Sequence, residues 1–308
     1  MVLRDLLRLQ RSGSLKEQMM ATYNALKFDV KGDGKTDDTS AFNKAVKALG
    51  KNDVLSVPAG KYMINAATGI SLKSDMTFRM LPGAELHVIP NDLWKYSLIR
   101  VYSANNVTIE GGKLVGDRAK HKPKARPDWK PSVPWNKYGE WGFGLDIRGS
   151  HDVEVKHTNV YDMWGDGFYI SNKNHGKDKA KRIKLTQVGA YNNRRQGLSV
   201  IAVSNLIVLN SVFRDTRGTR PAAGIDFEPD LADPKNVIED VLIKGSRFYN
   251  NQGAGIEFAV KKGITRNVVV TSDNKFGNNN KSIKSSTFSW WQNLIYSIFG
   301  WPKALRIR

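Results

Sequence analysis

A short phrase, a glycine followed by alternating apolar and outward-facing positions, recurs along the chain from residue 144 onwards. Its copies occupy residues 144–148, 167–171, 197–201, 224–228 and 255–259. By subtraction, the glycines of successive copies lie 23, 30, 27 and 31 residues apart. Repeats of this kind, whose short strands cannot bury their apolar face alone, predict a stacked solenoid.

Two further strands recur in the same register. Alternating apolar pairs predict one strand in each coil, at Val107/Ile109, Val153/Val155, Ile183/Leu185, Leu206/Val208, Val241/Ile243 and Val268/Val270. A third short strand then ends at a polar corner, at Asp162, Asn192, Asp215, Asn250 and Asn278. Asparagine tolerates the left-handed backbone of such corners, and stacked amides hydrogen-bond along the axis. Three strands per coil predict an all-β fold, a single-stranded right-handed parallel β-helix.

The two ends of the chain differ from the repeats. Residues 1–22 predict a helical extension with leucines on one side, and residues 23–280 predict the β-helix. The apolar period from 41 to 49 predicts an N-terminal capping helix, with Thr36 or Asp38 as its N-cap. The aromatic segment 281–308 is predicted to fold back as the C-terminal cap that a solenoid needs. Lesser interpretations of this tail are contact with a membrane interface or with another subunit, as in a homo-trimer.

Composition limits the domain organisation and the class of binding partner. A chain of 308 residues with 40% hydrophobic residues can bury a large core in one elongated domain. It has no cysteine and no run of 18 apolar residues, and its first residues do not resemble a secretory signal. The net charge of +19 attracts polyanions, and no nucleic-acid-binding module is visible. We therefore expect an acidic polysaccharide as the partner, with a merely solvated basic surface as the alternative.

Several phrases resemble a known family. "VKGDGKTDDTSAFNKAV" and the following "VPAGKY" closely resemble the first coil of the pectate-lyase superfamily. "GDGFYIS", "NNRRQGLSV" and "AAGIDFEPD" are similar to phrases of its polysaccharide-processing and phage tail-spike members, so the resemblance covers roughly residues 24 to 280. In that family the first segment is structural, which implies turn and cap roles for Asp33, Asp37 and Asp38. The superfamily hosts hydrolases, lyases, epimerases and non-catalytic spikes, so the resemblance implies the fold more than the activity.

Motifs of better-defined relatives are absent. Polygalacturonases carry paired aspartates, a Gly-His-Gly and an Arg-Ile-Lys, whereas Arg182-Ile-Lys184 lies here on a strand of buried alternation. Alginate epimerases carry an Asp-Pro-His-Glu motif after a Gly-Phe, but this chain continues from Gly167-Phe with Tyr-Ile. Neither activity therefore carries over residue by residue.

The outward positions of the glycine phrase carry the candidate chemistry. Asp146, Tyr169, Ser199, Asp226 and Glu257 are predicted to form one exposed column with a spacing of about 4.8 Å. Asp226 and Glu228 stand two residues apart on one strand, and Glu257 lies one coil below. Glycoside hydrolysis needs two carboxylates, and crowded acids raise one another's pKa so that one stays protonated.

Asp166 is a further candidate because it precedes the glycine of its coil and belongs to no repeated ladder. The alternative for all these acids is pairing with nearby arginines, namely Arg148, Arg194, Arg195, Arg217 or Arg220. With His121 from the segment described next, the catalytic candidates are Asp226, Glu228, Asp166, Glu257 and His121.

A long insertion separates Asp117 from Trp141 where a coil should turn promptly into its strand. A loop of this length inside a compact fold is usually functional or disordered, and its prolines and tryptophans argue against disorder. It is predicted to wall a groove with aromatic faces for sugar rings and cations for anionic groups. The predicted substrate-binding residues are Asp117, Lys122, Trp129, Trp135, Glu140, Trp141, Tyr169, Arg194 and Arg195. No spacing matches a specific metal site.

The leading hypothesis is a glycoside hydrolase that acts on an acidic polysaccharide in a groove on the β-helix face, without a cofactor. A polysaccharide lyase is the alternative within enzymes, with Arg195, Lys122 or His121 as the base and a divalent cation as an option. A non-catalytic tail spike or adhesin that binds glycan is the alternative from another class. The expected location is secreted, on a cell surface or on a virion.

Overall fold

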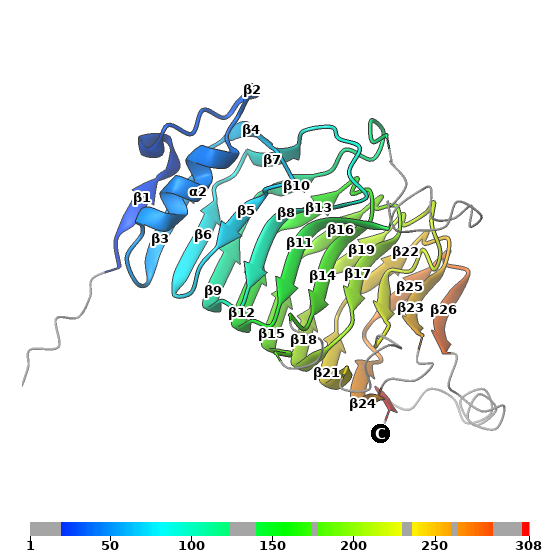
Figure 1. Cartoon of the computed structure of the whole chain (residues 1–308). Helices are drawn as coiled ribbons and strands as arrows, with labels where there is room; N and C mark the ends of the chain where they lie inside the picture. The colour runs from blue at the N-terminus through cyan, green and yellow to red at the C-terminus, as the bar shows by residue number, and fades with distance from the viewer. Residues whose placement is uncertain are drawn as a thin grey trace, which may run out of the picture.

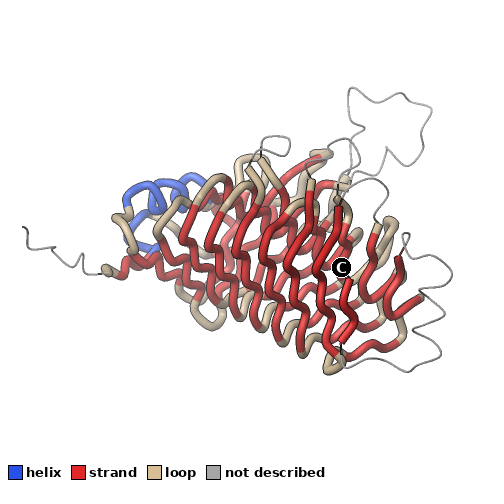
Figure 2. Tube along the Cα trace, turned by 90° about the horizontal axis from the view of Figure 1, so that it is seen from below, coloured by secondary structure: helices blue, strands red, loops and turns tan. Residues whose placement is uncertain are grey.

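The computed structural model describes residues 20–122, 140–173, 178–229, 236–259 and 264–285, and the backbone of 304–307. Strands stack into an elongated coil, with the helices at its N-terminal end (Figures 1 and 2). The coil is built from three sheets, which we name A, B and C. All paired strands are parallel except β27, which lies antiparallel to β24. The predicted all-β, right-handed parallel β-helix is confirmed.

The three sheets take one strand each from every full coil. Sheet A contains β1 (Thr22–Asn24), β3 (Asp53–Val57), β6 (Met76–Met80), β9 (Asn105–Glu110), β12 (His151–Lys156), β15 (Ala180–Thr186), β18 (Val203–Leu209), β21 (Val237–Lys244), β24 (Ile264–Thr271) and β27 (Ala304–Ile307). Sheet B contains β2 (Asp33–Asp37), β4 (Gly60–Ile64), β7 (Ala84–Val88), β10 (Lys113–Val115), β13 (Asn159–Tyr161), β16 (Gly189–Tyr191), β19 (Val212–Arg214), β22 (Arg247–Tyr249) and β25 (Lys275–Gly277). Sheet C contains β5 (Ile70–Leu72), β8 (Lys95–Tyr102), β11 (Trp141–Arg148), β14 (Asp166–Ser171), β17 (Gln196–Val200), β20 (Ile225–Phe227), β23 (Ala254–Phe258) and β26 (Lys281–Ser285). The glycine phrase therefore supplies sheet C.

The inward side chains form stacked columns inside the tube. On sheet C, Phe168, Leu198 and Ile225 are paired in register from coil to coil, and each is fully buried. On sheet B, Phe213 and Phe248 stack with ring centroids 5.5 Å apart. Full burial of such a side chain contributes about 1.5–3 kcal/mol, so these columns are the main source of stability.

The glycine of the repeated phrase has a steric cause. An added Cβ at Gly197 would lie 2.4 Å from the carbonyl oxygen of Gly224, and one at Gly224 would lie 2.6 Å from that of Gly255. The same relation joins Gly144 to Gly167, where the distance would be 2.6 Å. Each coil of sheet C packs its backbone onto the next at this position, and a side chain would separate them.

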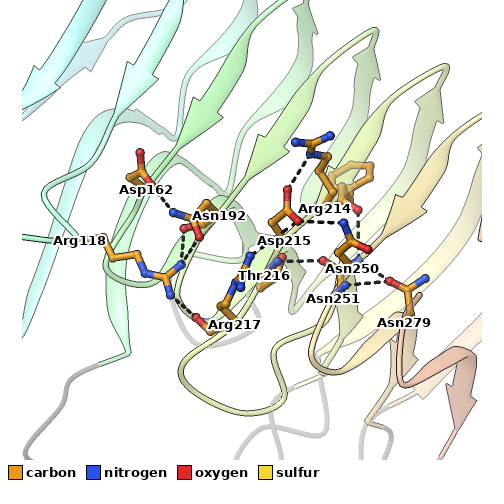
Figure 3. Close-up of polar contacts among 11 residues, drawn as sticks. Arg118, Asp162, Asn192, Arg214, Asp215, Thr216, Arg217, Asn250, Asn251 and Asn279 are labelled. Atoms are coloured by element: carbon orange, nitrogen blue, oxygen red, sulfur yellow. Dashed lines mark hydrogen bonds and ion pairs between the residues drawn. The ribbon is translucent and has the colours of Figure 1, made fainter. Parts of the chain in front are cut away.

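The polar corners between sheets B and C adopt the predicted left-handed backbone. The five corner residues Asp162, Asn192, Asp215, Asn250 and Asn278 have φ values from 51° to 61°. Asn192 Nδ2 donates to Asp162 Oδ1 at 2.5 Å, and Asn250 Nδ2 donates to Asp215 Oδ1 at 3.2 Å (Figure 3). Both aspartates therefore take part in the ladder of polar corners, as acceptors where the neighbouring coil supplies an asparagine.

The N-terminal cap consists of a short 3₁₀ helix, η1 (Ala25–Phe28), and the helix α2 (Thr39–Ala48). Phe42 of α2 is fully buried against the ring of Tyr62, 5.3 Å away. Asp38 occupies the predicted N-cap position, but its carboxylate accepts from the amides of Lys31 and Gly32 instead of the helix. Asp37 Oδ1 accepts from the Thr39 amide, so turn and cap roles of these aspartates hold while the expected capping bond of Asp38 is wrong.

Both ends of the predicted β-helix differ in detail from the sequence analysis. Residues 1–19 and 286–303 lie outside the described residues, which leaves the helical extension and most of the aromatic tail as predictions. Thr22 begins strand β1, and β26 continues sheet C beyond residue 280. In the described part of the chain, no helix is long and apolar enough to cross a bilayer.

Candidate functional site

A cleft of about 640 Å³ lies over the C-terminal half of sheet C. It is lined by Glu140, Arg195, Arg220, Pro221, Ala222, Glu228, Gln252, Gly253, Ala254, Glu257, Ala259, Asn280, Lys281 and Lys284. Three carboxylates and four cations thus share one cavity. Its walls come from β23, β26 and the segments that flank them, from the segments that lead into β11, β17 and β20, and from Glu228 just after β20.

The outward column of sheet C has the predicted register. Tyr169 pairs with Ser199, Ser199 with Asp226 and Asp226 with Glu257 along successive strands. The expected exposure of this column is wrong, however, because Asp146, Ser199 and Asp226 are fully buried. Long side chains of neighbouring coils fold over the column and fill the space outside the sheet.

Asp146 shows how this covering works. Its carboxylate accepts from Ser97 Oγ at 2.8 Å, from Arg148 Nε at 2.8 Å and from the Tyr102 hydroxyl. Arg148 lies over the ring of Tyr169, 4.7 Å from its centroid. This part of the column is a closed network, and Tyr169, predicted to bind substrate, does not line the cleft.

Asp226 lies beneath the floor of the cleft. Gln196 Nε2 donates to its Oδ2 at 2.8 Å, and its Oδ1 has no hydrogen-bond partner among the described residues. Burial raises the pKa of Asp226 well above its ordinary value, and the charge of Glu228 raises it further. Burial thus favours the protonated form of Asp226, and its carboxyl group is not paired with an arginine.

Arg195 is the centre of the site. Its Nη2 donates to Glu228 Oε2 at 2.7 Å, and its Nη1 contacts Asp166 Oδ2 and Ser199 Oγ, each at 3.2 Å. Its Nε lies 3.5 Å from Glu140 Oε2. Burial alone would lower the pKa of Arg195, but the nearby carboxylates outweigh it and raise that pKa. The guanidinium therefore stays charged and fixes three carboxyl groups around itself.

Asp166 is fully buried on the inner side of Arg195. Ser199 Oγ donates to its Oδ2 at 2.9 Å. Burial raises the pKa of Asp166 to about 7, against the opposing effect of Arg195. The structure thus brings the two predicted candidates Asp166 and Glu228 to one guanidinium, although Asp166 does not reach the cleft.

The carboxylates that reach the cleft are Glu140, Glu228 and Glu257. Burial raises the pKa of Glu140, and the charge of Glu228 adds to the effect, while Arg195 opposes it. Glu257 Oε1 accepts from Lys284 Nζ at 2.5 Å. Glu140 was predicted to bind substrate, and its position and raised pKa suit a proton donor.

Asp117 and His121 lie outside the cleft, in a buried cluster of their own. His121 Nδ1 is 2.9 Å from Asp117 Oδ2, and both side chains are fully buried. Tyr96 donates its hydroxyl proton to Asp117 Oδ1 at 2.6 Å, and the His121 ring stacks on Trp164 at 4.4 Å. Neither residue lines the cleft, so this geometry gives no support to a catalytic role of His121 or to substrate binding by Asp117, and both roles stay predictions.

The other predicted binding residues also lie apart from the cleft. Arg194 lies over the ring of Trp164, 4.0 Å from its centroid, and Trp141 packs edge-on against Trp94. Lys122 is exposed but does not line the cleft. Trp129 and Trp135 lie outside the described residues, so their groove role stays a prediction.

Sequence reasoning missed three groups in or beside the cleft as site residues. Gln196, which donates to Asp226, was not a candidate, and Lys281 and Lys284 fell in the predicted tail. Lys284 follows Glu257 by 27 residues, a normal coil spacing, but its coil lacks the glycine phrase. Among the described residues, no group of three or more histidines or acids is arranged to hold a metal ion.

Two family models match the chain. Residues 22–79 match one described as rhamnogalacturonase A/epimerase, pectate lyase-like. Residues 141–295, just over half of the chain, match the right-handed beta helix region. These matches agree with the resemblance predicted from the sequence.

Two curated relatives are similar over most of the chain. The uncharacterized protein YclG of Bacillus subtilis (strain 168) is 28% identical over 259 residues, which cover 76% of this chain and 42% of that protein. The exo-poly-α-D-galacturonosidase of Dickeya chrysanthemi is 28% identical over 257 residues, which cover 80% of this chain and 39% of that enzyme. The chain therefore spans about two-fifths of the length of these relatives.

A solved structure with the same fold is tailspike protein gp49 from Acinetobacter baumannii bacteriophage Fri1, a capsular polysaccharide depolymerase. It superposes with a TM-score of 0.61 at 14% identity and covers 86% of this chain and 49% of that one. At this identity the likeness shows the fold alone.

Proposed function

This chain belongs to the right-handed β-helix family, and on that premise we propose that it is a glycoside hydrolase that cleaves an acidic polysaccharide. The reaction takes place in the cleft over sheet C. The observation that carries the proposal is that Glu140 and Glu228 both line this cleft and both contact Arg195, at 3.5 Å and 2.7 Å. Two carboxyl groups held across one cation give the pair that glycoside hydrolysis requires.

The environments of the two groups assign their roles. Burial raises the pKa of Glu140, so its carboxyl group donates a proton to the glycosidic oxygen as the bond to the anomeric carbon breaks. Glu228 takes a proton from the attacking water in an inverting reaction, or attacks the anomeric carbon itself in a retaining one. The anomeric configuration of the first product distinguishes the two courses.

Asp166 and Asp226 support this pair from beneath the cleft. Both are fully buried, and burial raises the pKa of each. The raised pKa values favour protonation, which limits the negative charge around Arg195 and leaves its guanidinium to orient Glu228 and Glu140. They are positioning residues, because neither lines the cleft.

Hydrolysis is favoured over elimination because none of the three residues predicted as a lyase base is a free base in the described cleft. A lyase removes a proton beside a uronate carboxylate, and the predicted bases were Arg195, Lys122 and His121. Arg195 has a raised pKa because carboxylates surround it, and neither His121 nor Lys122 lines the cleft. Elimination would also leave an unsaturated sugar, which ultraviolet absorbance detects.

The relatives support a polysaccharide as the substrate class. One of them is by name an exo-poly-α-D-galacturonosidase, and the net charge of +19 suits a polyanionic chain. We expect the protein to act outside the cell, on a cell surface or on a virion. A homo-trimer stays a prediction.

The test measures reducing ends released from polygalacturonate, alginate and neutral dextran by the chain and by its Glu228→Gln variant. We expect release from at least one polyuronate and a loss of about 10²–10⁴-fold in the variant. Glu154→Gln is the matched control, since Glu154 pairs with Lys184 on sheet A and stays far from the cleft. Tight binding without release from any polymer would instead favour a non-catalytic glycan-binding protein.

A further inference from the structure

The cations of the cleft are not all neutralised. Glu228 and Glu140 contact Arg195, and Glu257 contacts Lys284. The other two cations that line the cleft, Arg220 and Lys281, have no carboxylate partner in the parts of the chain that the structure describes. A cation inside a cavity with no internal partner is available for an anion from a ligand.

The backbone holds the two segments that carry these cations against the coil that lies between them. Lys281 begins β26 and pairs in register with Ala254, and the preceding Asn280 amide donates to the Gly253 carbonyl at 3.0 Å. Arg220 precedes Ala222, whose carbonyl accepts from the Gly253 amide at 2.8 Å. Gly253 therefore ties the two cation-bearing segments together.

The coil rise gives the offset of Lys281 from the strand of Asp226. β26 pairs with β23 and β23 pairs with β20, so β26 lies two strand spacings, about 9.6 Å, from the strand that carries Asp226. Lys281 therefore lies toward the C-terminal end of the cleft, whereas Arg220 leads into β20, the strand that Glu228 follows.

We infer that Arg220 and Lys281 form a subsite for the anionic group of a charged sugar, next to the bond that is cleaved. The position of the cleaved bond next to this subsite rests on the proposed function. The binding of an anion by Arg220 and Lys281 does not depend on it. The group that binds there is a carboxylate or sulfate on a sugar ring. Its attraction to the two cations makes the protein bind acidic glycans in preference to neutral ones.

The test compares the Arg220→Gln/Lys281→Gln double variant with its parent, both in a Glu228→Gln background so that polymer is not consumed. Binding to polygalacturonate, dextran sulfate and dextran is measured by affinity electrophoresis at several salt concentrations. We expect the double variant to lose at least tenfold in affinity for an anionic polymer, with a weaker salt dependence and unchanged binding to dextran. Polygalacturonate and dextran sulfate distinguish carboxylate from sulfate.

A charge-matched control removes two exposed lysines that do not line the cleft, Lys27→Gln/Lys275→Gln, and should keep the parent affinity. Equal losses in the double variant and this control would overturn the inference, because the effect would then reflect net charge alone. Affinity of the double variant within twofold of the parent would also overturn it, as would the absence of any anionic binding by the parent.

The outcomes separate this inference from the proposed hydrolysis. If the active chain releases no reducing ends but anionic binding depends on Arg220 and Lys281, the subsite stands and the hydrolase fails. If the active chain cleaves polyuronates equally well with and without both cations, the hydrolase stands and the subsite fails.

Discussion

Arg195 Nη2 donates to Glu228 Oε2 at 2.7 Å, which joins the residue just before β17 to the residue just after β20. The bond crosses between successive coils, so it adds a side-chain link to the backbone pairing of two strands of sheet C. It also turns a carboxylate that would otherwise move freely at the mouth of the cleft toward one side of the cavity. The same ion pair therefore links two coils and orients the Glu228 carboxylate in the cleft.

Replacing Arg195 by glutamine should destabilise the protein. The change leaves Asp166 and Glu140 without their counter-charge, and breaking a buried ion pair from one side costs about 3–5 kcal/mol. The loss in unfolding free energy should be smaller at pH 5 than at pH 8, because protonated carboxyl groups need no counter-charge. Urea denaturation at both pH values measures it.

Arg214→Gln is the control for this prediction. Arg214 pairs with Asp215 at 2.7 Å, but its side chain is 51% exposed, so the loss should stay below about 1 kcal/mol. Equal destabilisation by Arg195→Gln and Arg214→Gln would show that the buried network contributes no more than a surface pair.

Asp166 should make the stability fall as the pH rises toward neutrality. Burial raises its pKa from 3.8 to about 7 in the folded state, so the folded chain holds this proton more tightly than the unfolded chain. Its contribution to the unfolding free energy therefore decreases between about pH 4 and pH 7, by up to about 1.4 kcal/mol per pH unit, and is constant above. Asp166→Asn removes this dependence, which urea denaturation at pH 5, 6 and 7 would show.

Asp152→Asn is the matched control on sheet A. A hydrogen bond from Arg182 lowers the pKa of Asp152, so that group loses its stabilising effect only in acid and leaves the slope from pH 5 to pH 7 unchanged. Parallel pH profiles of the parent and Asp166→Asn would contradict the assignment.

The corner residue Asn192 allows backbone and hydrogen-bond effects to be separated. Its φ is 51°, its Nδ2 donates to Asp162 Oδ1, and its Oδ1 accepts from Arg118 Nη1 at 3.0 Å. Asn192→Ala should cost about 1–2 kcal/mol for the left-handed backbone and about 1 kcal/mol for each lost hydrogen bond. Asn192→Gly should cost less, because glycine accepts this backbone. Thermal or urea unfolding of both variants tests the ladder, and equal losses would contradict the backbone contribution.

The sequence predicted the coil because the pleat fixes side-chain direction. Alternation alone placed Tyr169, Ser199, Asp226 and Glu257 in one column, and the register of the strands confirms it. It did not predict that this column is covered, since the covering comes from long side chains of other coils such as Arg195. Burial of outward residues depends on those contacts, which a periodic pattern does not contain.

The sequence could not predict the buried position of His121 for the same reason. Its surroundings include Tyr96 and Trp164, which are distant in sequence and meet only because the chain coils. A histidine in a long insertion is typical of a functional loop, and only the three-dimensional packing distinguishes that from a buried structural group. Lys281 and Lys284 were assigned to the tail because their coil lacks the glycine that marks the others.

Gly197 provides the strictest test of why the repeated phrase begins with glycine. Its added Cβ would lie 2.4 Å from the Gly224 carbonyl oxygen and 3.0 Å from the Phe213 ring, and neither neighbour can move without shifting a coil. Gly197→Ala should therefore lower the unfolding free energy by about 1–3 kcal/mol, the usual cost of overpacking a filled core. Thr108→Ala, a half-buried outward position on β9, should change it by less than about 1 kcal/mol. If urea denaturation gave the same stability for Gly197→Ala and the parent, the coil spacing would tolerate a methyl group, and the glycines would need another explanation.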